Sequence, residues 1–467
     1  MFEFEKVLLQ LDEDEIINSE TFYHANLFIW PFIRHEIYEL LMAGEVGFQE
    51  RHGKPTESRK TPVGDIDFKS YYEAHKNNLE IIHKHKILFL CNMVRSVLTK
   101  NGKIFDKEID YFVNLHESSY ISYIAYNNQY HENRYIDNSS YMNHIFFKGT
   151  LYNRLKSIAF KKEYPILTYL YRNNIIDNKW QRHLNEKLCQ LDYTLPIIKK
   201  NYIKFLNHIE PEIVFIRLAS YGRYAHLVRW AKEIGVKVGE FQHGLISQAH
   251  MAYNYSNKLY DNDQYKAYWP DYILTYGDYW NKQIGIPCKK YVVGNPHFCT
   301  SKQNYFDIYE DKNTVLILSQ GTMTKKFVEL AIYLSQNLKD YKVVFKLHPT
   351  EVYFEDRYEV LYKYNNIEVV KTGDIYEYIA KYEKIIAHTS TVAFEATAFN
   401  KRIFILDDEH TKRNMPDTLG MRFEEPLDLV HMLREQDSKE VTYDSEYYFN
   451  CNWAENYRNF LNDELSL

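Results

Sequence analysis

Short apolar runs alternate with amphipathic helices along much of this chain, and that alternation limits its fold more than any other feature of the sequence. Ile213–Leu218 and Val236–Phe241 have the composition of buried strands, and residues 221–235 between them form an amphipathic helical pattern that ends at Gly235. A strand, a helix and a second strand at this spacing form the unit of a parallel sheet. The sequence therefore predicts an α/β protein.

The alternation occurs in two series. The first contains the predicted strands Ile87–Cys91, Ile213–Leu218, Val236–Phe241, Tyr272–Tyr276 and Tyr291–Val293. After a polar stretch at 301–313, the second contains Val315–Ser319, Val343–Leu347, Ile367–Val370, Ile385–Ala387 and Ile403–Leu406. A chain of 467 residues also exceeds what one hydrophobic core usually supports. We therefore predict two Rossmann-like domains that face each other across a cleft.

Changes in composition suggest where these parts begin and end. We expect an extra helical region at 1–85, one Rossmann-like domain at 86–305, a second at 306–440, and a terminal helix at 441–467 that packs back on the first domain. Within the first region, Glu20–Met42 has helical spacing that Pro31 should kink or restart. Residues 49–67 have the composition of an exposed loop.

The charge balance excludes one broad class of function. The chain has 57 basic and 63 acidic side chains and a net charge of −6, which argues against a protein that coats nucleic acid by neutralising phosphates. The N-terminal sequence has no basic-then-apolar signal, and no apolar run approaches the roughly 18–20 residues of a membrane span. We expect a cytoplasmic protein.

Neither the cysteines nor the acidic pairs predict a metal site. The five cysteines are scattered without a CxxC pair, so we expect no disulfide framework, no zinc site and a reducing compartment. Asp12-Glu-Asp14 and Asp261-Asn-Asp263 have a DxD form that can bind metal, but neither follows a clear strand. We expect both pairs to be solvated, and we predict neither a metal nor a cofactor.

Four short motifs follow predicted strands, where open parallel sheets bind their ligands. The first is Gln242-His243-Gly244, with His250 and Tyr253 close behind. A histidine between a strand end and a glycine turn can face a cleft and accept a proton near neutral pH. The alternative is a histidine that only holds the loop together.

The second and third motifs differ in what they indicate. Gly-Asn295-Pro after a strand is typical of a turn and could mark an interdomain hinge. Lys346-Leu-His348-Pro349 ends a strand with a cation and an imidazole on one face, and Pro349 forces the chain to leave the strand. Such a cluster suits a pyrophosphate or a nucleoside phosphate.

The fourth motif, His-Thr389-Ser390-Thr391, ends a strand with hydroxyl groups and precedes a helix. Ser390 or Thr391 at the N-cap would leave backbone N–H groups directed at an anion. Glu395 lies about one turn further on, within reach of ribose hydroxyls. An ordinary capped helix is the alternative. The fingerprints GxGxxG, GxxxxGK[ST] and GxSxG do not occur, which argues against nicotinamide binding, P-loop and α/β-hydrolase chemistry.

The order QHG (242–244), GNP (294–296), KLHP (346–349) and HTST with EA (388–391 and 395–396) resembles GT-B glycosyltransferases of bacterial capsule, lipopolysaccharide and teichoic-acid synthesis. The His-Pro and Ser/Thr pairs resemble those of bacterial sialyltransferases and Kdo transferases, which hold the phosphate and nucleoside of a CMP-sugar. QHG is similar to the WHG motif of CDP-glycerol glycerophosphotransferases. The resemblance covers about residues 210–410.

This resemblance implies a glycosyltransferase with a CMP-activated donor, such as a sialic acid-like or Kdo-like sugar, and a glycan or lipid-linked glycan acceptor. The domain at 86–305 would bind the acceptor and the domain at 306–440 the nucleotide. His243 would be the catalytic base, with Gln242, Gly244, His250 and Asn295 near the acceptor. The donor would be bound by Lys346, His348, Pro349, Thr389, Ser390, Thr391 and Glu395. Peripheral association with the inner membrane face is compatible with such a role.

Two departures from the family pattern leave alternatives open. The acidic-acidic-Gly motif that supplies the base in the sialyltransferases has no convincing counterpart, and Asn400 stands where many GT-B chains have glycine. The nearest alternative function is a CDP-polyol phosphotransferase of the teichoic-acid type. A UDP-sugar 2-epimerase is less favoured because its HxRE-like signature is missing, and a non-catalytic carbohydrate-binding protein is the remaining alternative.

Overall fold

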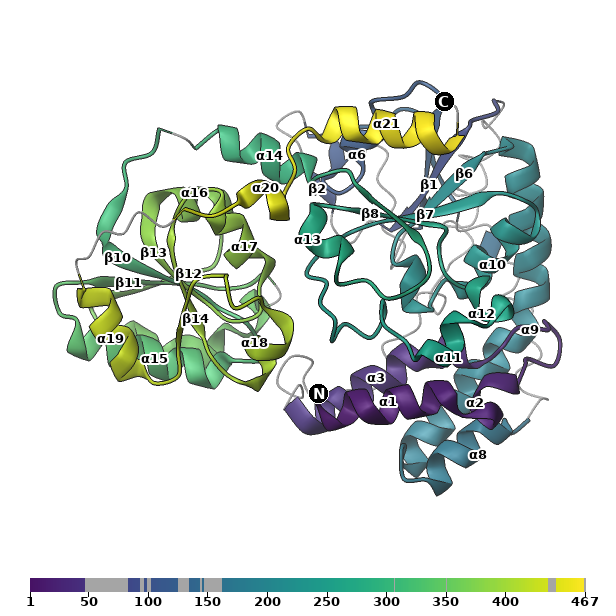
Figure 1. The fold of residues 1–467 in the computed structure, drawn as a ribbon, viewed down its shortest axis with the longest axis horizontal. Helices are drawn as coiled ribbons and strands as arrows, with labels where there is room; N and C mark the ends of the chain where they lie inside the picture. The colour runs from purple at the N-terminus through teal and green to yellow at the C-terminus, as the bar shows by residue number, and fades with distance from the viewer. Residues whose placement is uncertain are drawn as a thin grey trace.

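Two parallel sheets in separate domains make up most of the computed structural model (Figure 1). The structure describes residues 1–46, 83–92, 96–98, 102–124, 134–142, 145–146, 162–305, 307–349, 351–435 and 442–465. The loop predicted at 49–67 lies outside these residues.

The first sheet has seven strands in the order β5-β4-β1-β6-β7-β8-β9, all parallel. In chain order these strands are β1 (Ile87–Asn92), β4 (Ser119–Ile124), β5 (Ser139–Tyr141), β6 (Ile213–Ile216), β7 (Lys237–Phe241), β8 (Tyr272–Thr275) and β9 (Lys289–Val292). A separate antiparallel pair is formed by β2 (Ser96–Leu98) and β3 (Ile104–Asp106).

The second sheet has six parallel strands in the order β12-β11-β10-β13-β14-β15. They are β10 (Asp311–Leu318), β11 (Lys342–Lys346), β12 (Ile367–Val370), β13 (Tyr382–Ala387), β14 (Arg402–Leu406) and β15 (Met421–Phe423). Counted along the chain this order is 3-2-1-4-5-6, the doubly wound order of dinucleotide-binding folds. The predicted fold class is therefore confirmed: the chain has two Rossmann-like domains in the GT-B manner.

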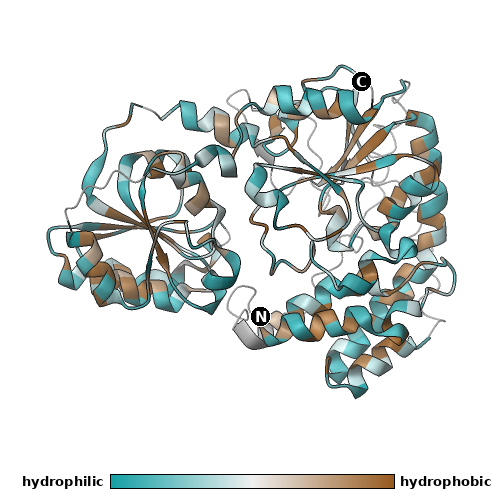
Figure 2. Ribbon diagram, in the orientation of Figure 1, coloured by the Kyte–Doolittle hydropathy of each residue, from teal (hydrophilic) through white to brown (hydrophobic). Residues whose placement is uncertain are grey.

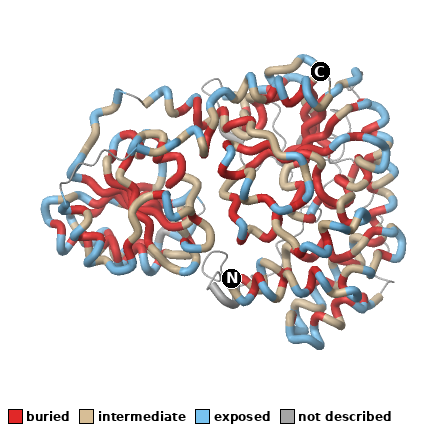
Figure 3. Tube along the Cα trace, viewed as in Figure 1, coloured by how far each residue is buried: buried red, intermediate tan, exposed pale blue. Residues whose placement is uncertain are grey.

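Helices cover both faces of each sheet, and the strands between them are buried (Figure 3). Figure 2 shows that the hydrophobic residues concentrate in the strands, whereas the outer faces of the helices are hydrophilic. The helices of the first domain are α6 (Asp110–Val113), α8 (Pro165–Arg172), α9 (Asn178–Ile209), η2 (Ala219–Tyr221), α10 (Ala225–Glu233), α11 (Asn257–Tyr260), α12 (Asp263–Lys266) and α13 (Asp278–Asn281). The chain leads into the second domain through α14 (Pro296–Gln303). The helices of the second domain are α15 (Thr324–Asn337), η3 (Val352–Lys363), α16 (Ile375–Lys381), α17 (Thr391–Thr397), α18 (Glu409–Asn414) and α19 (Pro426–Arg434). The chain returns through α20 (Ser445–Tyr448) and α21 (Trp453–Leu465).

The N-terminal region contains α1 (Glu3–Glu13), α2 (Glu15–Ser19) and α3 (Trp30–Val46). The helical pattern predicted over Glu20–Met42 is wrong before Trp30, whereas the restart expected near Pro31 is observed. Thr21 and Phe28 instead pair as an isolated antiparallel bridge, and the helix begins at Trp30. Pro31 therefore lies in the first turn, where its missing N–H costs no helical hydrogen bond.

A buried ion pair joins this region to the first domain. The Asp12 carboxylate accepts from Arg34 Nε at 2.7 Å and Nη2 at 2.7 Å, and from the Trp30 indole at 2.9 Å. Arg34 also donates to the backbone carbonyls of Met251 and Asn254. Asp12 is fully buried, so the expectation that the acidic pair at residues 12–14 is solvated is wrong for Asp12, whereas Asp263 is exposed as expected.

The C-terminal segment returns to the first domain. On α21, Tyr457 and Phe460 pack with Phe215 and Phe241 of the seven-stranded sheet, and Figure 1 shows the helix lying along the first domain. Before it, Cys451 forms a disulfide with Cys299 of α14. The expectation that no disulfide forms is therefore wrong for this pair, whose separation of 152 residues hid it from spacing rules.

No helix in the described ranges is long and apolar enough to cross a membrane.

We predict that Asp12→Ala lowers the free energy of unfolding by about 3–5 kcal/mol, because it leaves the Arg34 guanidinium buried without a counter-charge. Chemical denaturation would measure the loss. Asp263→Ala is the matched control, because its carboxylate pairs with Lys266 at 2.8 Å in an exposed position and should change stability little. Equal losses in the two variants would contradict the assigned importance of the buried pair.

Candidate functional site

A cleft of about 590 Å³ lies between the two domains. It is lined from the first domain and α3 by His35, Tyr38, Glu39, Met42, Tyr221, Leu245 and His250, and from the second domain by Gln320, Thr322, Met323, Lys325, Lys326, His388, Thr389, Asp408, His410 and Asn414. In the second sheet the strand order reverses between β10 and β13, and the loops after these two strands supply Gln320, Thr322, His388 and Thr389. Ligands of open α/β sheets bind at such a reversal.

The side of the cleft that the first domain and α3 line is called the N-terminal wall, and Tyr221 lies at its centre. Its hydroxyl lies 3.1 Å from His243 Nε2 and 2.8 Å from His250 Nε2. Tyr221 follows β6, which is the strand next to β1 where the order of the first sheet reverses. Gly222 fixes the place of Tyr221, because it has a φ of +78° and a Cβ there would lie 1.9 Å from the carbonyl oxygen of Pro31. The Tyr221 loop is thereby held against the start of α3.

His35 of α3 extends this wall, with its ring 4.7 Å from that of Tyr221. Burial, helped by the nearby charges of His250 and Arg34, lowers the pKa of His35 to about 3. Burial also lowers the pKa of His250 to about 4. Both imidazoles are therefore neutral near pH 7, and each has one N–H donor and one acceptor nitrogen.

Glu240 lies behind this wall at the end of β7. One carboxylate oxygen accepts from the backbone N–H of Ser220 at 2.8 Å and from its hydroxyl at 2.6 Å, and the other accepts from the Tyr253 hydroxyl at 2.8 Å. Complete burial raises the pKa of Glu240 to about 7. Glu240 therefore ties the strand end to the loops that carry Tyr221 and His250.

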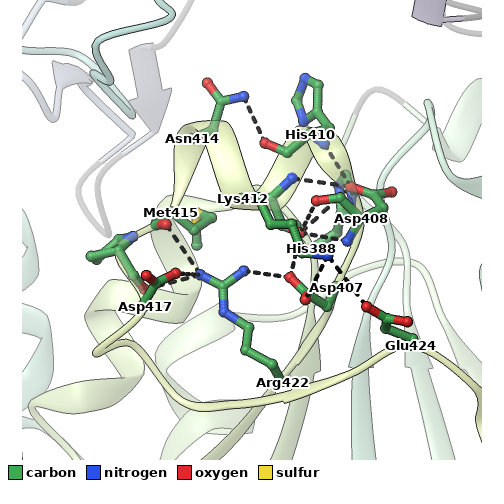
Figure 4. A network of polar contacts seen from close by, with 12 residues as sticks. His388, Asp407, Asp408, His410, Lys412, Asn414, Met415, Asp417, Arg422 and Glu424 are labelled. Carbon is green, nitrogen blue, oxygen red and sulfur yellow. Dashed lines mark hydrogen bonds and ion pairs between the residues drawn. The ribbon is translucent and has the colours of Figure 1, made fainter. Parts of the chain in front are cut away.

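The opposite wall contains a pair between the buried His388 and the partly exposed Asp408 (Figure 4). His388 Nε2 lies 3.0 Å from both carboxylate oxygens of Asp408. Burial would raise the pKa of Asp408, but the hydrogen bond and charge of His388 outweigh it and hold that pKa well below its usual range. The His410 ring stacks on His388 with the centroids 5.4 Å apart. The other ring nitrogen of His388 contacts Thr389 Oγ1 at 3.2 Å, and Thr389 accepts from Gln320 Nε2 at 2.9 Å.

Two lysines line the same side of the cleft as this pair. Lys325 and Lys326 lie in the first turn of α15, directly after the loop that follows β10. Lys326 Nζ is 3.7 Å from an Asp408 carboxylate oxygen and its side chain is largely exposed. A helix start with two cations and a glutamine in the preceding loop suits a bound anion.

Of the residues predicted near the acceptor, only His250 lines the cleft. Gln242 is buried, and its side chain hydrogen-bonds to backbone groups. Its Nε2 donates to Gly244 O at 2.8 Å, and its Oε1 accepts from Tyr276 N at 2.9 Å. The chain bends at Gly244 as predicted, but Gly244 has no positive φ and a Cβ there would meet nothing within 4 Å, so the bend does not require glycine. Asn295 caps α14 by accepting from Phe298 N at 3.1 Å.

The KLHP motif begins at Lys346, the last residue of β11, and continues into the loop that follows. Lys346 is buried with its ammonium 5.6 Å from the Tyr378 ring, and burial lowers its pKa. His348 and Pro349 are exposed. The buried Glu351 accepts from His348 N at 3.0 Å and from the Ser319 hydroxyl at 3.1 Å. That carboxylate therefore joins the loop after β11 to the loop after β10. Phosphate binding by His348 stays a prediction.

The HTST motif behaves partly as predicted. Ser390 is the N-cap of α17 and accepts from Val392 N at 3.2 Å, and Thr391 is the first residue of that helix. Glu395 is buried, and burial raises its pKa to about 7 although the charge of Lys107 opposes the shift. Asn400 has a φ of +52°, the left-handed conformation in which glycine is ordinarily favoured.

Sequence reasoning missed several residues of this cleft, namely His35, Tyr221, Gln320, Lys325, Lys326, Asp408 and His410. The polar run Gln320-Gly-Thr after the predicted strand Val315–Ser319 was a signal for one loop, and Asp407-Asp408 after the strand Ile403–Leu406 was a signal for another. His35 had none, because it lies on a helix far from either series. Among the described residues, no group of three or more His, Cys, Asp or Glu side chains is arranged to hold a metal ion.

No family model matches the chain, and no curated protein matches it. Several solved structures are similar. A UDP-GlcNAc 2-epimerase from Methanocaldococcus jannaschii is 10% identical, with 81% of this chain and 99% of that chain covered at a TM-score of 0.46. The enzyme from Neisseria meningitidis bound to UDP-GlcNAc is 12% identical, with coverage of 82% and 100% and a TM-score of 0.44. A sucrose-phosphate synthase from Thermosynechococcus elongatus is 10% identical, with coverage of 80% and 94% and a TM-score of 0.42.

We predict that Glu240→Gln removes a pH-dependent loss of stability. Because the pKa of Glu240 is raised from its usual 4.5 to about 7 in the folded protein, its stabilising contribution is complete below pH 4.5 and is lost as the pH rises through about 7. The melting temperature of the variant should therefore gain on that of the parent between pH 5 and pH 8. Glu233→Gln, at an exposed position of α10, should show no such trend. A constant difference across this range would contradict the prediction.

Proposed function

We propose that this chain is a glycosyltransferase that moves a sugar from a nucleotide donor to a hydroxyl acceptor in the interdomain cleft. The observation that carries the proposal is the pairing of two unlike walls across one cleft. One wall offers the hydroxyl of Tyr221, which is hydrogen-bonded to His243 and His250, and the other offers a cation at Lys326 and an amide at Gln320. Transfer of a sugar to a hydroxyl needs both, because a proton leaves the acceptor while negative charge develops on the departing phosphate.

The donor would lie against the second domain. Lys325 and Lys326, with the backbone N–H groups at the start of α15, would hold the phosphates by charge-assisted hydrogen bonds. Gln320 and Thr389 would contact the donor from the loops after β10 and β13. Glu395 is buried and is not among the described residues that line the cleft, so its contact with ribose, which the motif resemblance implies, stays a prediction. No metal has a part in this scheme.

The acceptor would enter from the first domain. Its hydroxyl would approach Tyr221 and His250, and the aromatic and apolar side chains of Tyr38, Met42 and Leu245 would pack against the acceptor sugar. His243 would receive the proton. The motif resemblance favours a CMP-activated donor, and the identity of the nucleotide is the first quantity to measure.

A thermal-shift screen of CMP, CDP, UDP and GDP should find one nucleotide that raises the melting temperature, because a ligand that binds only the folded protein stabilises it. The protein would then be incubated with the matching nucleotide sugar and the products followed by NMR. Release of nucleotide that depends on an added glycan acceptor supports transfer. Inversion at C2 of the donor sugar without release would establish an epimerase instead, and release of CMP from CDP-glycerol would establish a polyol-phosphate transferase.

We predict that Lys326→Ala weakens nucleotide binding about 10-fold or more, since one charge-assisted hydrogen bond contributes roughly 1.5–3 kcal/mol. Calorimetry on the folded variants would measure the affinity. Lys412→Ala is the matched control: Lys412 is similarly exposed and pairs with Asp407 at 3.3 Å, but it does not line the cleft. His348→Ala tests the KLHP prediction in the same assay. An unchanged affinity of Lys326→Ala would remove α15 from the donor site.

A further inference from the structure

One hydroxyl joins the two histidines of the N-terminal wall. Tyr221 Oη is 2.8 Å from His250 Nε2 and 3.1 Å from His243 Nε2, so the phenol can donate only one of these hydrogen bonds and must accept the other. The direction in which the two bonds run decides where a proton that reaches Tyr221 would go.

The remaining contact of His250 fixes that direction. The backbone N–H of Ala252 donates to His250 Nδ1 at 3.4 Å, and His250 is neutral near pH 7 because burial lowers its pKa to about 4. A neutral imidazole that accepts at Nδ1 carries its proton on Nε2. His250 therefore donates to Tyr221, and Tyr221 donates its own proton to His243 Nε2.

The three groups differ in their access to the cleft. Tyr221 and His250 line it, whereas His243 is not among the described residues that do. The QHG histidine thus stands one hydrogen bond behind the surface that a substrate meets. Tyr221 therefore lies between the cleft that it lines and the ring of His243.

We propose that Tyr221 is the catalytic residue that meets the acceptor and that it passes the acceptor's proton to His243. This inference rests on the proposed function and deepens it. As the acceptor O–H bond breaks, its proton binds Tyr221 Oη, and the original phenolic proton moves to His243 Nε2. The acceptor oxygen forms its bond to the anomeric carbon of the donor. The bond from that carbon to the phosphate oxygen breaks, and its electron pair leaves with the nucleotide.

Other titratable groups face Tyr221 and set the charge balance of the relay. The His35 ring of α3 and the Tyr253 ring lie 4.7 Å and 5.9 Å from the Tyr221 ring, and Glu240 is hydrogen-bonded to Tyr253 behind them. His35 is neutral near pH 7 because burial lowers its pKa to about 3. When His243 gains a positive charge in this step, the neutral rings of His35 and His250 do not repel it.

The direction of the chain can be tested without any substrate. In long-range ¹H–¹⁵N spectra of histidine-labelled protein near pH 7, we expect His250 in the Nε2–H form and His243 in the Nδ1–H form. Tyr221→Phe should change the nitrogen shifts of both rings. Finding His243 protonated at Nε2 would overturn the relay, because the chain would then run the other way. This result does not depend on which nucleotide sugar the protein uses.

The transfer itself is tested by kinetics with the nucleotide sugar identified in the screen. Tyr221→Phe keeps the ring and removes only the hydroxyl, and it should lower the single-turnover rate about 10²–10⁴-fold with nucleotide affinity unchanged. His243→Ala should lose a similar factor, and the double variant should lose no more than either single variant, because the residues act as one unit. Tyr265→Phe, which removes a hydroxyl bonded to Asn18 at 2.8 Å outside the cleft, controls for lost stability.

Two outcomes would overturn the proposal. The first is near-parent turnover in Tyr221→Phe together with a large loss in His243→Ala, which would show that His243 meets the acceptor directly. The second is additive losses in the double variant. A bowed dependence of the parent rate on the D₂O fraction that becomes linear in Tyr221→Phe would confirm that two protons move in one step. Failure of the proposed function would instead appear in the parent protein, as products other than a transferred sugar.

Discussion

The arrangement of the cleft depends on the buried pair between Asp12 and Arg34. A bidentate carboxylate–guanidinium contact inside a protein holds two chain segments in one geometry, because any shift leaves a desolvated charge without its partner. Here the pair links α1 to α3, and the remaining donors of Arg34 reach the carbonyls of Met251 and Asn254. His35 lies one residue beyond Arg34, and His250 one residue before Met251. The same contact therefore sets the spacing of two cleft-lining histidines that come from distant parts of the chain.

The two domains meet this cleft in corresponding ways. In the first sheet the strand order reverses between β1 and β6, and in the second between β10 and β13. The loops that follow β6 and β13 both reach the cleft. In the first domain that loop carries Tyr221, and in the second it carries His388 and Thr389. Parallel topology accounts for this correspondence, because all strands of a sheet end at one edge and the helices diverge at the reversal.

The sequence was sufficient for the fold class because apolar strands and amphipathic helices have distinct periodicities. It failed where the periodicity is short or absent. The strands β4 and β5, with the sequences SYISYI and SSY, are rich in Ser and Tyr and carry no continuous apolar run. The Cys299–Cys451 pair depends on a return of the chain that spacing cannot express.

The candidate site was predictable only in part, for a related reason. His250 and Thr389 follow predicted strands, and both line the cleft. The neighbouring Gln242 and Ser390 follow strands equally well, yet their polar atoms bind the backbone nearby. Strand-end position alone does not tell a ligand contact from a cap, because both need the same small polar side chains. Tyr221 and His35 meet only through the packing of Gly222 against Pro31, which no local pattern expresses.

The chain passes between the domains twice, and both passages lie along one edge of the molecule. Gly294 precedes α14 on the outward passage and packs against Asn450 on the return, where a Cβ would lie 2.0 Å from the carbonyl oxygen; the disulfide joins the same two segments. The two chain segments that connect the domains are therefore joined to each other at this edge. Away from this edge, α18 of the second domain makes two further contacts. Asn414 accepts from the Ser247 hydroxyl at 2.6 Å, and Arg413 pairs with Glu5 at 3.1 Å. Any rotation of the domains about the disulfide-linked edge would break these noncovalent contacts and would widen the cleft beside α1.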